Sequence, residues 1–164
     1  MTRICVAVFT FALSFFAASS TQAQELTVGV GTTDFGDQGT DSAVFEVEYR
    51  HTPFIQKRNM SVAFGANAAV SGEGDLFIGA GIWSRWQWDS GWFIDNSVMP
   101  GLFEAGTAGN DLGSAFEIRT LLGVGYRFDN GNALSAAITH RSNASLATDN
   151  PGMNTYTIRY HISF

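Results

Sequence analysis

The chain has 164 residues, a formal net charge of −6, and charged residues at only 15% of its positions. An acidic chain with so few Lys and Arg residues is not expected to bind nucleic acid, because such binding depends on cations that neutralise phosphates. Low charge, 18 glycines and 13% aromatic residues are instead typical of a small membrane β-barrel, since about 25% of residues in soluble domains are charged.

The first 23 residues have the pattern of a secretory signal peptide. Arg3 provides the positive start, residues 4–18 form an apolar stretch, and small residues before Gln24 offer a cleavage site. A membrane anchor is the weaker alternative, because a transmembrane helix needs roughly 20 apolar residues. We therefore expect residues 24–164 to form one domain, which contains no cysteine because Cys5 lies in the signal peptide.

The rest of the chain alternates apolar and polar residues with the period of a β-strand. In chain order, the alternating segments lie at residues 26–30, 45–50, 62–70, 76–82, 92–97, 116–127, 134–142 and 155–164. The last segment is the most regular, with Tyr156, Ile158 and Tyr160 in one phase and polar residues in the other. The segment at 92–97 is the least regular. The pattern predicts eight strands.

An eight-stranded antiparallel transmembrane β-barrel is the fold class that this pattern favours. Transmembrane strands span about 9–11 residues, and every backbone group in a bilayer must be paired, which closes the sheet. A soluble sandwich or lipocalin-like barrel also alternates, but its interior is apolar. Here the other phase repeatedly contains charged residues such as Glu46, Glu48 and Arg119, which are expected to pair inside the barrel.

Loop lengths predict the orientation, because outer-membrane barrels have short periplasmic turns and longer outside loops. Counted from a periplasmic N-terminus, the outside loops are residues 31–42, 71–75, 100–114 and 143–153. Trp83, Trp86, Trp88 and Trp92 flank a turn and are expected to form an interfacial girdle. The segment 134–142 then ends near the outer leaflet of the membrane.

This segment carries the most distinctive chemistry of the chain. Its alternation puts His140 and Ser142 on the apolar face, two residues apart. A serine hydroxyl becomes a nucleophile when a neighbouring base takes its proton. In the last segment, Asn154 has the parity needed to reach and orient the histidine. Asn143 is placed to donate a hydrogen bond to a developing oxyanion.

The same residues also have a non-catalytic interpretation. His140 and Ser142 at the end of a membrane strand can sit at the headgroup level, hydrogen-bonded to lipid or water. The spacing His-x-Ser is a weak motif by itself and leaves both interpretations open. No histidine has a second His, Cys or carboxylate at ligand spacing, so no metal is expected, and serine chemistry requires no cofactor.

The last fifty residues contain three further features: His-Arg-Ser-Asn-Ala at 140–144, Asn-Pro-Gly at 150–152, and a last strand ending at Phe164. Together they resemble the lipid A 3-O-deacylase family of the PagL type, whereas the first half of the chain shares only the barrel pattern. The resemblance implies an eight-stranded outer-membrane enzyme that hydrolyses the acyl ester at position 3 of lipid A on its lipid-facing wall. It also implies that His140 is the base, Ser142 the nucleophile and Asn143 an oxyanion contributor.

One position departs from the family pattern. The family has a glutamate twelve residues after the serine, and gap-free counting puts Asn154 there. An amide can orient an imidazole, but it stabilises imidazolium less than a carboxylate does. Weaker activity, replacement by Asp149 and loss of function are therefore all open, and Asn154 is favoured as the orienting residue.

The resemblance makes lipid A within lipopolysaccharide the expected substrate, and the outer membrane the expected location. Two rival functions are a non-enzymatic barrel with a structural or adhesion role, and an acyltransferase that moves chains between lipids. Homodimer formation is a further open possibility.

Overall fold

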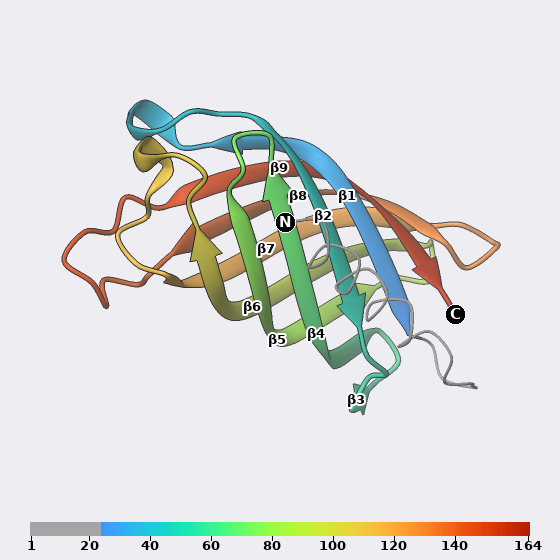
Figure 1. Ribbon diagram of the computed structural model, residues 1–164. Coiled ribbons are helices and arrows are strands. Elements are labelled where there is room, and N and C mark those ends of the chain that lie inside the picture. The colour runs from blue at the N-terminus through green and yellow to red at the C-terminus, as the bar shows by residue number, and fades with distance from the viewer. Residues whose placement is uncertain (1–23) are drawn as a thin grey trace, which may run out of the picture.

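The computed structural model describes residues 24–164 as a ring of antiparallel strands (Figure 1). The expected signal peptide, residues 1–23, lies outside the described residues. The strands are β1 (Glu25–Asp34), β2 (Ala43–Arg50), β3 (Ile55–Gln56), β4 (Met60–Ser71), β5 (Leu76–Gln87), β6 (Trp92–Glu104), β7 (Phe116–Arg127), β8 (Ala133–Ser142) and β9 (Met153–Ser163). Two short 3-10 turns, η2 (Gly36–Gln38) and η3 (Ala108–Asn110), follow β1 and β6. Within the described residues, no helix is long and apolar enough to cross a membrane.

Eight of these strands form the wall of a closed barrel, which confirms the expected fold class. Each wall strand pairs with the next along the chain, and the ring closes where β1 pairs with β9. The β1–β9 ladder runs from the pair Glu25–Ser163 to the pair Asp34–Asn154, so it joins the two ends of the sheet over the full length of β1. The two-residue β3 is an extension of the turn between β2 and β4.

The apolar phase of the strands faces outward. On β9, Tyr156, Ile158 and Tyr160 are exposed, whereas the intervening Thr157 and Arg159 are buried. β7 and β8 alternate in the same way over most of their length. An apolar exterior around a charged interior is the reverse of a soluble barrel, and it suits strands that face membrane hydrocarbon.

Ion pairs fill the part of the lumen near the two ends of the described chain. Arg50 and Arg85 each contact both Glu25 and Asp95, with N–O distances of 2.7 or 2.8 Å. His161 lies beside them, with its Nδ1 atom 2.8 Å from a Glu25 oxygen. Burying a charge costs free energy, and pairing it with an opposite charge offsets much of that cost. The pairing expected from the alternating sequence is therefore present.

A second group of ion pairs centres on Glu48, which is fully buried. One of its oxygens accepts a hydrogen bond from Arg50 Nε at 2.8 Å. The other lies 3.1 Å from Arg119 and 2.8 Å from Arg159. Glu46 contacts the same two arginines at 3.0 and 2.9 Å. These contacts tie β2 to β7 and β9 across the lumen.

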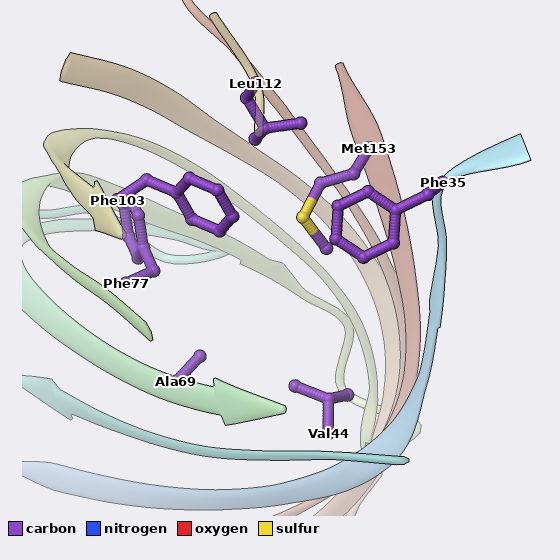
Figure 2. Packing of buried hydrophobic residues seen from close by; sticks show 7 residues of the cluster. All are labelled: Phe35, Val44, Ala69, Phe77, Phe103, Leu112 and Met153. Carbon is purple, nitrogen blue, oxygen red and sulfur yellow. The ribbon is translucent and has the colours of Figure 1, made fainter. Parts of the chain in front are cut away.

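Apolar side chains fill the end of the lumen at which the longer loops lie, and they form what we call the outer plug (Figure 2). Its members are Phe35, Val44, Ala69, Phe77, Phe103, Leu112 and Met153. Figure 2 shows that their side chains point into a common space enclosed by the strands. Next to the plug, the buried Asn110 of η3 donates to both carboxylate oxygens of Asp75, at 3.1 and 2.9 Å. The loops at this end are thus anchored from inside the barrel.

The expected tryptophan girdle is wrong for one of its four members. Trp86, Trp88 and Trp92 are exposed, but Trp83 is buried in the lumen. Its ring lies 4.4 Å from the guanidinium carbon of Arg50. The reason is parity, because Trp83 shares the inward phase of β5 with Arg85.

β6 is also longer than expected, because it continues through Pro100 to Glu104 instead of ending before the proline. Pro100 is exposed on the outer wall. The β5–β6 register is interrupted beside it, between the pairs Gly79–Gly101 and Ile82–Val98. A proline lacks the N–H needed for the ladder, so it is tolerated where the ladder is interrupted.

Candidate active site

The candidate site lies on the outer wall at the end of β8, between β7 and β9. His140 pairs with Thr120 on β7 and with Asn154 on β9. Its side chain is exposed, as the parity of β8 predicted. Ser142, the last residue of β8, is two positions further toward the end of the barrel at which the 143–152 loop lies (Figure 1).

The imidazole of His140 is oriented by Asn154. Its Nδ1 atom lies 3.0 Å from Asn154 Oδ1. Because an amide oxygen only accepts, Nδ1 carries the proton in this arrangement and Nε2 is left with a lone pair. This is the tautomer that a general base requires, and a neutral amide is sufficient to select it.

Ser142 stands beside this histidine without a hydrogen bond to it. The serine is half-buried, and its strand partner on β7 is Ile118. Residues two apart on one strand face are separated by roughly 6.5 Å along the strand, so the two side chains can meet after rotation about their χ angles. Hydrogen bonds of catalytic groups often tighten only when substrate is bound.

Asn143 lies on the opposite side of the wall from Ser142. It is fully buried, and its Nδ2 atom donates to the backbone oxygens of Leu112 at 3.1 Å and Asp149 at 2.7 Å. Its backbone N–H donates to Asn150 Oδ1 at 2.9 Å. All of its donors are therefore engaged in holding loops. In this arrangement Asn143 has no free donor for an oxyanion next to Ser142.

The loop directly after Ser142 makes a tight turn with unusual backbone angles. Ala144 and Ser145 have φ angles of 53° and 62°, in the left-handed region that residues with a Cβ rarely adopt. Leu146 N–H closes the turn by donating to the backbone oxygen of Asn143 at 3.0 Å. Backbone strain of this kind is maintained by surrounding contacts and is concentrated at functional sites. The hydrogen bonds of Asn143 supply those contacts.

Asp149, the alternative orienting residue, has other neighbours. Its backbone oxygen accepts from Asn143, and its backbone and Cβ atom face Gly113 in the β6–β7 loop. The structure brings Asn154, and not Asp149, into hydrogen-bond contact with His140.

Gly152 is a site residue that the strand pattern could not identify. Its φ angle is +70°, and a Cβ atom placed on it would lie 3.0 Å from His140 Cε1 and 3.5 Å from Nε2. The loop backbone therefore lies against the edge of the imidazole that carries the free lone pair. The signal in the sequence was the Asn-Pro-Gly motif, whose position relative to His140 depends on the fold of the loop.

A shallow apolar groove with a volume of about 500 Å³ lies on the outer wall next to His140, on the side away from the 143–152 loop. Its larger lining residues are Val30, Leu122, Val124, Ile138, Tyr156 and Ile158. Gly31 and Ala136 also line it and, being small, leave room between these side chains. Ile138 and Tyr156 are each two residues from His140 and Asn154, on the same face. The groove therefore borders the candidate site, although His140, Ser142 and Asn154 do not line it.

The remaining histidines do not join this site. His161 is buried in the lumen, where it contacts Glu25 and Ser135. His51 lies in the turn after β2. Over residues 24–164, no three His, Cys, Asp or Glu side chains are grouped so that they could hold a metal ion.

The closed barrel, with its apolar exterior and charged lumen, has the architecture of an outer-membrane β-barrel. The His140–Asn154 pair on its exterior is a candidate hydrolase site. The model of the lipid A 3-O-deacylase (PagL) family matches residues 43–163. The chain therefore belongs to the lipid A 3-O-deacylase family, as the motifs in its last fifty residues predicted. No curated protein matches it in sequence.

Solved structures support the fold. The crystal structure of the outer membrane enzyme PagL matches with a TM-score of 0.67 and 21% identity, over 84% of this chain and 98% of that chain. Neisserial surface protein A matches with a TM-score of 0.60 and 10% identity, over 90% and 100% of the two chains. A de novo designed transmembrane β-barrel matches with a TM-score of 0.58 and 9% identity, over 89% and 98%. Similarity at these identities concerns the fold alone.

Proposed function

We propose that this chain is a lipid A 3-O-deacylase that acts from the outer leaflet of the bacterial outer membrane. In this proposal Ser142 is the nucleophile, His140 the base and Asn154 the orienting residue. The observation that carries the proposal is the hydrogen bond between His140 Nδ1 and Asn154 Oδ1, because it leaves Nε2 unprotonated on the same wall as Ser142. Membership of the lipid A 3-O-deacylase family supplies the substrate class.

The reaction is ester hydrolysis in two steps. His140 Nε2 takes the proton of the Ser142 hydroxyl as the oxygen attacks the carbonyl carbon of the 3-O-acyl ester. The tetrahedral intermediate collapses, the sugar oxygen leaves with the proton from His140, and the acyl chain remains on Ser142. Water, deprotonated by His140, then attacks the acyl-enzyme. As the fatty acid is released, His140 returns that proton to the Ser142 oxygen. No cofactor is consumed.

The apolar groove is the proposed binding surface for the acyl chain. It begins beside His140 and is lined by Ile138 and Tyr156 at that end. A chain lying in it stays in contact with apolar side chains while its ester reaches the polar rim of the wall. Small-molecule sites typically combine an apolar surface with a few converging polar groups.

Asn143 is proposed to contribute to the oxyanion site as a positioning residue. Its side chain holds the β6–β7 and β8–β9 loops together through Leu112 and Asp149. This fixes the strained turn at Ala144 and Ser145, whose backbone lies directly after the nucleophile. Backbone N–H groups held in this way are common donors to a developing oxyanion.

Mass spectrometry of lipid A tests the proposal. Gram-negative cells that express the chain are compared with cells that express Ser142→Ala, both with the barrel verified as folded in the outer membrane. We expect lipid A to lose one hydroxyacyl group with the parent protein alone. A full acyl set in both strains would support the non-enzymatic barrel. The specific argument for that alternative is that this chain has Asn154 where the family has a glutamate. A gain in lipid A mass would support the acyltransferase instead.

A further inference from the structure

A carboxylate lies one strand beyond Asn154, on the side opposite His140. β9 pairs Asn154 with His140 on β8 and with Asp34 on β1. Thr120 on β7 completes the row on the other side of His140. Outward-facing partners in adjacent antiparallel strands are direct neighbours on the sheet surface. Thr120, His140, Asn154 and Asp34 therefore form one row across the outer wall.

The carboxylate of Asp34 is held in place by two hydrogen bonds. Gly36 N–H donates to Oδ1 at 3.1 Å. The hydroxyl of Tyr156 donates to Oδ2 at 3.1 Å. Tyr156 lies two residues after Asn154 on the same face of β9, so this second bond spans β1 and β9 beside the candidate site. The carboxylate is thus tied to the outer surface, at the end of the row.

The Asn154 amide lies between the two ends of this row. Its oxygen accepts a hydrogen bond from His140, and its strand partner on β1 is Asp34. The two oxygens of Asp34 are engaged by Gly36 and Tyr156, so the carboxylate acts on the rest of the row through its electric field. Of the four residues in the row, Asp34 alone carries a charge.

We propose that Asp34 is a positioning residue that supplies, across Asn154, the negative charge that the third site residue lacks in this chain. The inference rests on the proposed function. When His140 takes the proton from Ser142 it becomes a cation, and the Asp34 carboxylate, about 10 Å away across two strand spacings, stabilises that cation. The neutral Asn154 sets the tautomer, and Asp34 provides the charge.

The other charges near the row are engaged elsewhere. In the β1–β2 loop, the Asp41 carboxylate accepts a hydrogen bond from Phe35 N–H at 2.8 Å and is not a strand partner of Asn154. On β7, the outward residues nearest His140 are Ile118 and Thr120, which are neutral. On β8, Arg141 points into the lumen, where its guanidinium lies over the ring of Phe77 at 4.9 Å. In the β8–β9 loop, Asp149 packs on Gly113.

A double-mutant cycle tests the inference with purified, folded barrel and lipid A in mixed micelles. Asp34→Asn should lower kcat roughly threefold with little change in KM, the size expected for two exposed charges about 10 Å apart. Asp34→Glu should restore most of the loss. Asp37→Asn is the matched control, because Asp37 is an exposed acid in the same loop, and it should leave kcat unchanged.

Asn154→Asp provides the decisive background, because it places a carboxylate directly on His140. In that background, Asp34→Asn should have no effect on kcat or should raise it, since two neighbouring carboxylates repel each other. An equal loss in both backgrounds would mean a merely structural role and would overturn the inference, as would full kcat in Asp34→Asn alone. The proposed function fails on different grounds, namely full activity of Ser142→Ala. A folded but inactive parent that Asn154→Asp activates would overturn both.

Discussion

Gly152 limits the space around the imidazole of His140. A methyl group there would lie 3.0 Å from Cε1, at a backbone position with a φ angle of +70°. We expect Gly152→Ala to displace the imidazole and to lower kcat by on the order of 100-fold, because small displacements of a catalytic group have effects of that size. Deacylase assays on folded protein measure it.

Gly131→Ala is the control for this prediction. Gly131 also has a positive φ, +86°, in the turn between β7 and β8, and a Cβ on it would meet nothing within 4 Å. Both variants carry the same kind of backbone strain, but only Gly152 faces His140. Equal activity of the two variants would show that the contact with the imidazole is unimportant.

Strand parity explains which site residues the sequence could predict. His140, Ser142 and Asn154 share the outward phase, and the structure puts all three on the outer wall. Asn143 has the inward parity, and its side chain is accordingly buried. The expectation that its side chain donates to an oxyanion beside Ser142 did not take this inward parity into account. Gly152 and the turn at residues 144–145 depend on loop conformation, which alternation does not describe.

The groove between β1, β7, β8 and β9 owes its depth to small residues on these strands. Ala136 lies among its lining residues, two positions before Ile138 on β8. We expect Ala136→Leu to fill the groove and to lower kcat/KM for long-chain 3-O-acyl substrates by roughly tenfold, within the range that small changes in an apolar pocket produce. Short-chain esters should be hydrolysed at an unchanged rate.

Ala66→Leu provides the comparison for this variant. Ala66 is exposed on β4, where its partners are on β2 and β5, far along the ring from the groove. It adds the same apolar volume to the outer wall. If Ala66→Leu lowered long-chain hydrolysis as much as Ala136→Leu does, the groove would not be the acyl site.

The alternation predicted that each strand exists better than it predicted where the strand ends, because strand ends depend on hydrogen bonding to the neighbouring strands. The alternation predicted a loop over residues 100–114, but β6 continues through Pro100 to Glu104, and the β5–β6 ladder is interrupted beside this proline. The irregular alternation at 92–97 likewise concealed a strand of 13 residues. β6 is held as a strand by its pairing with β5 and β7, which the alternation of its own residues does not reveal.

The barrel as a whole encloses buried ion pairs, and removing one partner of such a pair is expected to be costly. Glu48 contacts Arg50, Arg119 and Arg159, and all four side chains are almost fully buried. We expect Glu48→Gln to destabilise the barrel by about 3–5 kcal/mol, because it leaves buried guanidinium groups with too little negative charge. Thermal unfolding in detergent, followed by circular dichroism, measures the change.

Glu73→Gln serves as the reference for this variant. Glu73 lies exposed in the short turn between β4 and β5, outside the lumen. Removing its charge should leave the unfolding temperature nearly unchanged. A Glu48→Gln barrel as stable as the Glu73→Gln barrel would mean that the lumen tolerates unbalanced charge, contrary to the role given to the ion pairs.

The placement of His140 and Ser142 on the outside of a filled barrel determines how a lipid would arrive. The lumen is occupied by ion pairs and by the outer plug, so the route to the site runs along the leaflet and not through the protein. Encounters then take place in two dimensions. The velocity follows the mole fraction of substrate in the lipid phase instead of its concentration in the bulk volume. If the proposed function holds, the membrane is the reaction medium of this protein as well as its surroundings.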